Sequence, residues 1–226
     1  ITLQEDARIG LVLWLRVRTD LPTRLLVTTE DLATGLSTAV PCNQAHRTAH
    51  NLVVMDLRAE SSYRIHVTAV TKGGKSTSAE VPATTGPLPA FLDALNVEQI
   101  DPDRMQPGYT LISGMYDRPE VSSHFAVALD GAGEVAFYRD QIGGSFFVPT
   151  GAGSYLADLD GSGPIAITDL LGTETMGSLD PVDFGARVFH HWRGVSRDGT
   201  YLTIGVEMRT IGGFPGPGGQ SVEYNI

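Results

Sequence analysis

The stretch Tyr63-Arg64-Ile65-His66-Val67-Thr68-Ala69 decides the fold class of the first part of the chain. Its odd-numbered residues are aromatic or apolar, and its even-numbered residues are polar. Successive side chains of a β-strand point to opposite faces of a sheet. The pattern therefore predicts a half-buried strand with Tyr63, Ile65, Val67 and Ala69 on one face.

Similar segments precede this strand. Residues 11–18 begin as an apolar run and settle into alternation, residues 24–29 follow the turn-forming Asp20-Leu21-Pro22, and residues 51–57 form a third apolar segment. This order predicts strand, turn and strand. The chain of 226 residues has 26 Gly and 13 Pro but only 19% charged residues, a composition that disfavours helices and supplies tight turns. We therefore expect an all-β protein.

Charge and cysteine content exclude several classes of protein. The formal net charge is -10 and the pI is near 4.9, so the surface should repel nucleic acid. Cys42 is the only cysteine, which excludes an internal disulfide, and we expect it to be a small buried hydrophobe. No apolar run is long enough for a membrane span. The start at Ile1 and the end at Ile226 lead us to expect a processed or partial polypeptide.

The first domain carries a resemblance to a known module. Leu57 is followed six positions later by Tyr63, then come the alternating strand, a Gly73-Gly74 turn and a closing Thr84-Thr85-Gly86. This order resembles the second half of a fibronectin type III domain. The resemblance implies that Tyr63 lies at a corner between two sheets and that its hydroxyl bonds to nearby backbone. A generic β-sandwich is the alternative, and either one would occupy residues 1–86.

A proline-bearing hinge, residues 86–89, marks the start of the second domain, residues 87–226. Alternating segments with Gly-rich or Asp-Gly tips predict hairpins at 125–139, 155–172 and 188–206. Spacings of roughly 30 residues are typical of radial repeats such as propeller blades. Only about two blades fit, whereas closed propellers have at least four. We expect further chain or another polypeptide to complete the ring, and we expect the Gly- and Pro-rich residues 212–219 to form an exposed loop.

One segment of the second domain contains candidate catalytic or binding residues. Phe189-His190-His191-Trp192 precedes Asp198-Gly199-Thr200-Tyr201-Leu202 and Glu207-Met208-Arg209. Shorter motifs come before it, at residues 85–89, 105–111 and 128–135. In this order they resemble the bacterial arylsulfotransferase family, over most of residues 57–210. The resemblance implies a small N-terminal β-sandwich joined to a six-bladed propeller.

The resemblance also implies an activity. In that family a propeller-channel histidine carries a sulfuryl group from a phenolic sulfate ester to a phenol, without a nucleotide, a metal or another cofactor. The nucleophile there is a neutral imidazole, and cationic or hydrogen-bonding groups offset the charge on the sulfuryl oxygens. The implied small-molecule partners are an aryl sulfate and a phenol, and the implied location is the periplasm or the cell exterior.

His190 and His191 are the candidate site residues. Adjacent side chains of a strand face opposite ways, so at most one of the two lines the channel. We expect His191 in the site and His190 between blades, although the reverse assignment is nearly as well supported. Trp192 stands where family members commonly have an acid, and their covalent nucleophile is usually on a later blade, which here would lie beyond Ile226. His191 would then bind sulfate or assist; a purely structural histidine pair is an equal alternative.

Other candidate sites have simpler explanations. Residues 158–169 have the acid spacing of a calcium loop, but strand-like flanks favour a hairpin tip. His46 and His50, close to Cys42, are expected in a surface loop rather than at a metal. His66 and His124 have no evident partners in the sequence, and we expect structural roles for them.

Two functions therefore stay open. The first is an arylsulfotransferase-like enzyme, which requires chain beyond Ile226. The second is a non-catalytic module outside the cytoplasm that binds a protein partner, or a second copy of itself, through the sandwich and the open blade edges.

Overall fold

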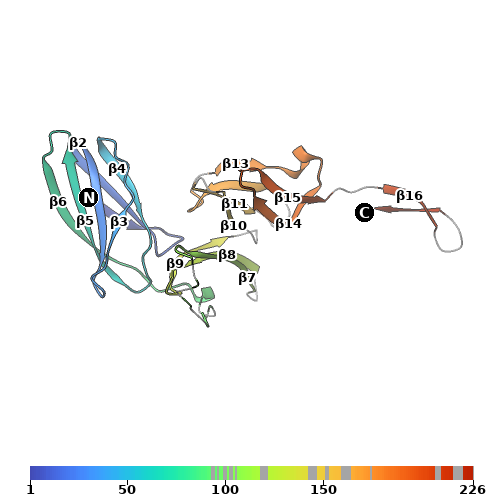
Figure 1. The fold of residues 1–226 in the computed structure, drawn as a ribbon, viewed down its shortest axis with the longest axis horizontal. Coiled ribbons are helices and arrows are strands. Elements are labelled where there is room, and N and C mark those ends of the chain that lie inside the picture. Colours follow the sequence, from blue (N-terminus) through green and yellow to red (C-terminus); the bar gives the residue numbers. More distant parts are fainter. Residues whose placement is uncertain are drawn as a thin grey trace. The chain divides into compact units, whose positions relative to one another are not determined.

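A computed structural model of the protein describes residues 1–92, 95, 97–98, 101, 104, 106–117, 122–141, 147–150, 153–158, 164–173, 175–206, 210–215 and 221–225 (Figure 1). Within these ranges, nothing is described of the side chains of residues 115–117, 122–124, 141, 147, 158, 190–193, 210–211, 214–215 and 221–225.

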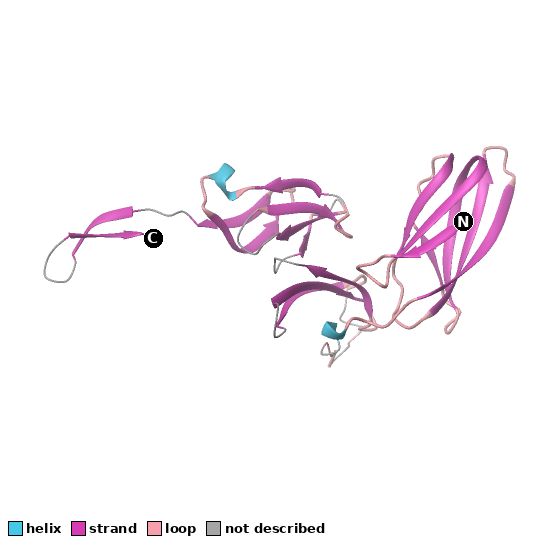
Figure 2. Ribbon diagram, turned by 180° about the vertical axis from the view of Figure 1, so that it is seen from behind, coloured by secondary structure: helices cyan, strands magenta, loops and turns pink. Residues whose placement is uncertain are grey.

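The all-β prediction is confirmed. The regular structure of the described residues consists of strands and two short 3-10 helices, as Figure 2 shows. The chain groups into two compact units. Unit 1 comprises Ile1–Ile112 and Val127–Arg139, and unit 2 comprises Ser113–Ala126 and Asp140–Ile226. Unit 1 thus includes residues 127–139, which the sequence assigned to the second domain.

The first six strands form one curled sheet. Their bounds are β1 (Thr2–Glu5), β2 (Leu13–Asp31), β3 (Ser37–Val40), β4 (Arg47–Val54), β5 (Ser62–Thr71) and β6 (Ser76–Thr84). The next elements are the 3-10 helix η1 (Ala90–Leu92) and a three-stranded sheet of β7 (Thr110–Asp117), β8 (Ser122–Leu129) and β9 (Val135–Gln141).

The long strand β2 joins two sets of strands. Its first part, Leu13–Arg18, pairs antiparallel with β4, and residues 13–16 pair with β1. Its second part, Thr23–Asp31, pairs with β5, and residues 27–30 pair with β3. Residues 19–22 pair with none of these strands, and the register of β2 against β4 shifts there. The sequence predicts a turn at these residues, but β2 continues through them as one strand. The curl of the sheet encloses the core between these two sets.

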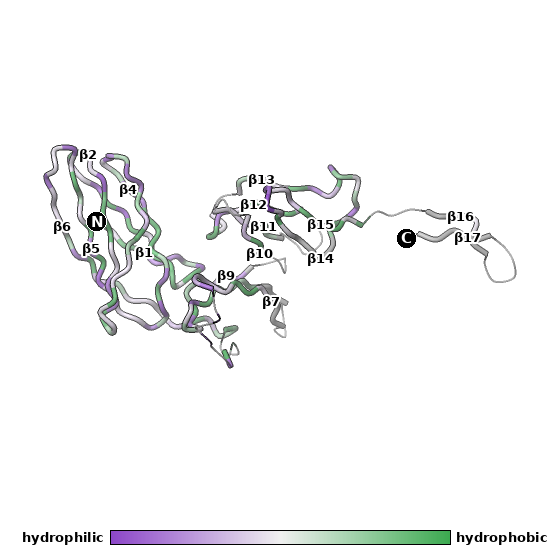
Figure 3. The backbone as a smooth tube through the Cα atoms, in the orientation of Figure 1, coloured by the Kyte–Doolittle hydropathy of each residue, from purple (hydrophilic) through white to green (hydrophobic). Residues whose placement is uncertain are grey.

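The core of this sheet contains the residues that the alternation predicted. Tyr63, Ile65 and Val67 on β5 are buried, and Leu57 before the strand has no exposed surface. The Tyr63 hydroxyl accepts a hydrogen bond from the backbone N–H of Arg58 at 2.8 Å. Figure 3 shows hydrophobic and hydrophilic residues mixed along these strands. Tyr63 therefore combines a buried ring with a backbone contact that holds the chain between β4 and β5.

We expect Tyr63→Phe to lower the free energy of unfolding by about 1–2 kcal/mol, because the Arg58 N–H loses its acceptor while the ring still fills its site. Urea denaturation monitored by circular dichroism measures the change. The matched control is Tyr201→Phe, because Tyr201 is 37% exposed in unit 2. Equal stability of Tyr63→Phe and the wild type would show that this hydrogen bond contributes nothing.

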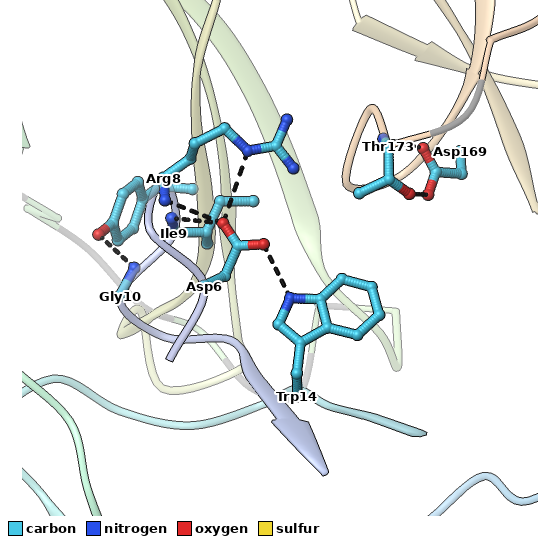
Figure 4. A network of polar contacts seen from close by, with 8 residues as sticks. Asp6, Arg8, Ile9, Gly10, Trp14, Asp169 and Thr173 are labelled. Carbon is cyan, nitrogen blue, oxygen red and sulfur yellow. Dashed lines mark hydrogen bonds and ion pairs between the residues drawn. The ribbon is translucent and has the colours of Figure 1, made fainter. Parts of the chain in front are cut away.

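A buried aspartate orders the loop between β1 and β2 (Figure 4). Asp6 Oδ1 accepts from the backbone N–H groups of Arg8 and Ile9 at 2.9 and 3.2 Å, and Oδ2 accepts from Trp14 Nε1 at 3.0 Å. Burial alone would raise the pKa of Asp6, but these donors together outweigh it and lower the pKa below its usual value. The carboxylate therefore stays ionised and fixes the loop.

The same loop contacts β9 within unit 1. The backbone N–H of Gly10 donates to the Tyr138 hydroxyl at 2.8 Å, and the Tyr138 ring packs edge-on against Phe91 with ring centres 6.3 Å apart. A Cβ on residue 10 would lie 3.2 Å from the Tyr138 hydroxyl, so a side chain there would crowd this contact. The loop between β1 and β2 is thus joined to β9 by part-buried groups.

Unit 2 contains a four-stranded antiparallel sheet whose strands are neighbours in chain order. Its strands are β10 (Phe147–Pro149), β11 (Ser154–Asp158), β12 (Ile165–Asp169) and β13 (Thr175–Leu179). The 3-10 helix η2 (Pro181–Phe184) follows, and then the hairpins β14 (Val188–Val195) with β15 (Tyr201–Val206) and β16 (Thr210–Pro215) with β17 (Ser221–Asn225). The hairpins predicted at 125–139, 155–172 and 188–206 are all present.

The prediction of a loop at residues 212–219 is wrong for its first part. Residues 212–215 belong to β16, whereas residues 216–219 lie outside the described residues. The register of β16 against β17 shifts between Ile211 and Phe214, and Gly213 has a φ of 82°. A bulge at the two glycines therefore lets this Gly-rich segment pair in a two-stranded ribbon.

Candidate functional site

The predicted histidine pair lies on β14. His190 and His191 follow Phe189, which is 3% exposed and packs in one core cluster with Leu156 of β11 and Ile165 of β12. The Phe189 ring also lies 5.9 Å from that of Phe184 in η2. Within unit 2, the hairpin that carries the histidines is therefore anchored on the four-stranded sheet. The His190 and His191 side chains lie outside the described part of the structure, so their contacts stay a prediction.

The backbone of β14 departs from the regular strand that the sequence argument assumed. On β15, Ile204 pairs with His190 and the preceding Thr203 pairs with Arg193. The two residues between them on β14, His191 and Trp192, therefore have no pairing partner on β15. Strict alternation of side chains, from which we inferred that only one histidine can face a given side, does not apply across such a bulge. Bulges are frequent next to active sites, where they change the direction of a side chain.

The tip of the β14–β15 hairpin is held by its own polar groups. Asp198 accepts hydrogen bonds from the Ser196 hydroxyl and, at 3.1 Å, from the backbone N–H of Thr200. The Ser196 contact, then the Thr200 contacts, lower the pKa of Asp198 to about 2. Gly199 adopts a φ of 84°, which only glycine accepts readily. The Asp-Gly tip predicted from the sequence therefore forms a closed turn.

A polar hollow of about 180 Å³ lies in unit 1. Three carboxylates, Asp31, Asp56 and Asp130, line it together with Arg58 and Thr29. Asp31 Oδ1 accepts from two backbone N–H groups of its own turn, one of them at 2.8 Å. The Arg58 guanidinium donates to Asp130 Oδ2 at 3.0 Å. Asp130 follows β8 at the tip of the β8–β9 hairpin, so this ion pair is a second contact of that tip with the part of unit 1 that holds the curled sheet.

The surroundings of Asp130 keep it ionised. Burial by itself raises its pKa, but the backbone N–H groups of Glu134 and Ala132 and the Arg58 side chain outweigh burial and lower the pKa. The same contact, led by the hydrogen bond to Asp130, raises the pKa of Arg58. The Arg58–Asp130 contact is therefore a fully charged ion pair at neutral pH.

This ion pair predicts an acid-sensitive contribution to stability. Because the folded-state pKa of Asp130 lies below its unfolded value, its contribution is present at neutral pH and is lost as the pH falls below about 4. Arg58 is 46% exposed, so we expect about 1 kcal/mol or less. Urea denaturation at pH 7 and pH 3 should show a smaller difference for Asp130→Asn than for the wild type. An unchanged difference would exclude this role.

His46, His50 and Cys42 are not arranged for metal binding. His50 was expected in a surface loop but lies on β4 and is only 7% exposed. Its Nε2 lies 3.0 Å from the Arg47 carbonyl oxygen, so the buried ring is satisfied by backbone. Cys42 Sγ contacts the Val40 carbonyl oxygen at 3.1 Å, and burial raises the pKa of this thiol. His46 is in the loop before β4, as predicted.

Residues 158–169 have the acid spacing of a calcium loop, but we expected a hairpin tip there. Residues 159–163 and the Asp158 side chain lie outside the described part of the structure. Asp169, the last residue of this segment, accepts hydrogen bonds from the Thr173 N–H at 2.6 Å and from the Thr173 hydroxyl (Figure 4). Across the described residues there is no group of three or more His, Cys, Asp or Glu side chains that could hold a metal ion.

Sequence reasoning missed the partners of His66. Its Nε2 lies 3.1 Å from Glu30 on β2, and its Nδ1 lies 3.3 Å from Glu80 on β6. Arg64 contacts the same two glutamates. These residues meet only because β2, β5 and β6 are neighbours, so no local pattern could have revealed the cluster. The backbone of His124 lies on β8, and its side chain is not described.

No protein-family model matches the chain, and no curated protein or solved structure is significantly similar to it. Among the described residues, no helix is long and apolar enough to cross a membrane.

Proposed function

We propose that the protein is an arylsulfotransferase-like enzyme, in which a fibronectin-III-like sandwich precedes the first blades of a β-propeller. For the sandwich, the support is the division of strands into the set β1, β2 and β4 and the set β3, β2, β5 and β6. The hydrogen bond between the Tyr63 hydroxyl and backbone five residues upstream supports this proposal, because domains of this type have a similar corner contact.

For the propeller, the support is the four-stranded antiparallel sheet β10–β13 followed by the β14–β15 hairpin. Blades of a propeller are four-stranded meanders that pack face to face. Phe189 of β14 and Leu156 and Ile165 of the preceding sheet share a core cluster, as stacked blades would. A closed ring needs at least four blades. The described strands supply fewer, so under this proposal further strands, from this chain or from another polypeptide, complete the ring.

The reaction we propose is nucleotide-independent sulfuryl transfer at a histidine. In this reaction the S–O bond of an aryl sulfate breaks as an S–N bond to the imidazole forms. That S–N bond then breaks as an S–O bond to the acceptor phenol forms, and the acceptor's phenolic proton ends on the released phenol. Such transfer needs a neutral imidazole and groups that stabilise charge on the sulfuryl oxygens. The family places such proteins in the periplasm or outside the cell, and we propose that location here.

The observation that carries the proposal is the position of His191. It belongs to a two-residue bulge in a strand that is anchored by Phe189, whereas His190 keeps regular register with Ile204. A bulge on a rigid strand is a common way to direct one side chain into a site. We therefore assign His191 to sulfate binding or assistance in catalysis, and His190 to the blade.

The test is sulfuryl transfer by the native polypeptide from para-nitrophenyl sulfate to phenol. We expect His191→Ala to lower kcat by about 100-fold, the scale of losing one group that stabilises transition-state charge. His190→Ala is the matched control, and we expect it to retain most of its activity. Equal activity of both variants and the wild type would contradict the assignment of His191.

A second function, a non-catalytic interaction module, has one observation in its favour. Leu202 and Ile204 on β15 are 42% and 52% exposed, and such apolar side chains on a strand are a typical surface for another sheet or a protein partner. In that case the open blade edge would bind a partner protein or a second copy of the chain. Transfer activity that depends on His191 would exclude this as the main function.

A further inference from the structure

Three segments of unit 1 lie together at one end of the curled sheet. Thr23 of β2 pairs with Arg47 on one side and with Thr71 on the other. Residues 19–22 of β2, the loop before Arg47 and the β5–β6 turn after Thr71 therefore meet at this end. We call residues 18–24, 42–47 and 71–75 the basic tip.

The basic tip gathers positive charge in an acidic protein. It carries five cationic side chains and one acidic residue, Asp20, in a chain with 16 Lys and Arg and 26 Asp and Glu. The five are Arg18, Arg24, Arg47, Lys72 and Lys75. Arg24 is half-buried and the others are exposed. Within the described residues, no carboxylate forms an ion pair with any of them.

The charge of the whole chain is divided unevenly. Residues 1–86 have 9 Lys and Arg against 8 Asp and Glu, whereas residues 87–226 have 7 against 18. The first part is thus +1 and the second part -11, which together give the net charge of -10. The sandwich can approach an anionic surface although the protein as a whole is acidic. At physiological salt, charges more than about 8 Å apart are largely screened.

An exposed apolar side chain lies within the basic tip. Leu21 is 62% exposed and precedes Pro22, in the segment of β2 that pairs with no other strand. The Thr19 hydroxyl donates to the Leu21 carbonyl oxygen at 2.8 Å and contacts the Thr23 hydroxyl at 3.2 Å, so the bend is held by its own contacts. An exposed apolar residue in a cation-rich tip suits the boundary between lipid headgroups and acyl chains.

We propose that the basic tip is a docking surface for an anionic lipid bilayer, with the five cations on the headgroups and Leu21 inserted between them. Leu21 favours a bilayer over a soluble anionic polymer, because a polymer offers no apolar layer for it. This proposal goes beyond the sulfuryl-transfer function and is independent of it.

The test is co-sedimentation of the full chain with phosphatidylcholine vesicles, with and without phosphatidylglycerol. We expect binding only to the vesicles with phosphatidylglycerol, and release as the salt concentration rises. Each neutralised cation should weaken binding about fivefold, so the variant Arg24→Gln/Arg47→Gln/Lys72→Gln should bind about 100-fold more weakly. Leu21→Ser should weaken binding without changing its salt dependence.

The matched control is Arg104→Gln/Arg187→Gln/Arg197→Gln, which removes the same charge from exposed side chains outside the tip. An equal loss in this control, or equal binding to both kinds of vesicle, would overturn the proposal. Binding to soluble heparin without binding to vesicles would also overturn it and would indicate an anionic polysaccharide instead. If the triple tip variant does not fold, the proposal is still tested by the lipid and salt dependence of wild-type binding and by the vesicle binding of Leu21→Ser.

Discussion

Phe189→Ala is expected to lower the free energy of unfolding of unit 2 by about 3–5 kcal/mol, the usual cost of truncating a buried phenylalanine. Phe189 is 3% exposed and connects β14 to the core of the four-stranded sheet through Leu156 and Ile165. Its loss removes that contact and leaves a cavity. Urea denaturation monitored by near-UV circular dichroism measures the change.

The control for this variant is its ring neighbour. Phe184 lies 5.9 Å from Phe189 but is 65% exposed, so Phe184→Ala should cost less than about 1 kcal/mol. Similar losses for the two variants would mean that Phe189 does not anchor the hairpin. In that case the proposed stacking of blades would lose its main support.

Leu57→Ala should have an effect of similar size in unit 1, about 2–5 kcal/mol. The Leu57 side chain has no exposed surface, and it packs in the core cluster that includes Tyr63 and Ile65. Removing its methyl groups leaves a hole at the point where the chain passes from β4 to β5. Thermal and urea denaturation of the purified variant measure the loss.

Leu36→Ala is the matched control in the same unit, because Leu36 is 71% exposed. We expect it to change stability by less than about 0.5 kcal/mol. A loss below about 1 kcal/mol for Leu57→Ala would show that the site relaxes around the smaller side chain, contrary to the core described above.

Local patterns predicted much of the fold. The alternation from Tyr63 to Ala69 predicted the buried face of β5, and the hairpins at 125–139, 155–172 and 188–206 followed from alternating strands and turn-forming tips. These features depend on residues close together in sequence, where the periodicity of side chains and the φ angles accessible to glycine are decisive.

Contacts between distant residues were not predictable in this way. The Arg58–Asp130 ion pair joins residues 72 positions apart, and the Gly10–Tyr138 hydrogen bond joins residues 128 apart. The bulge at His191 and Trp192 was also not predictable, because the sequence of one strand does not show how many residues of the neighbouring strand pair with it. The sequence therefore names candidate site residues along the chain, but it does not predict the geometry of the strand that carries them.

The most direct test of the proposed function is a product assay on the native polypeptide with para-nitrophenyl sulfate and phenol, in the absence of any nucleotide. The proposal predicts that phenyl sulfate forms in step with the release of para-nitrophenol and that little phenyl sulfate forms with His191→Ala. Absence of phenyl sulfate from the reaction of a correctly folded wild-type protein would contradict it.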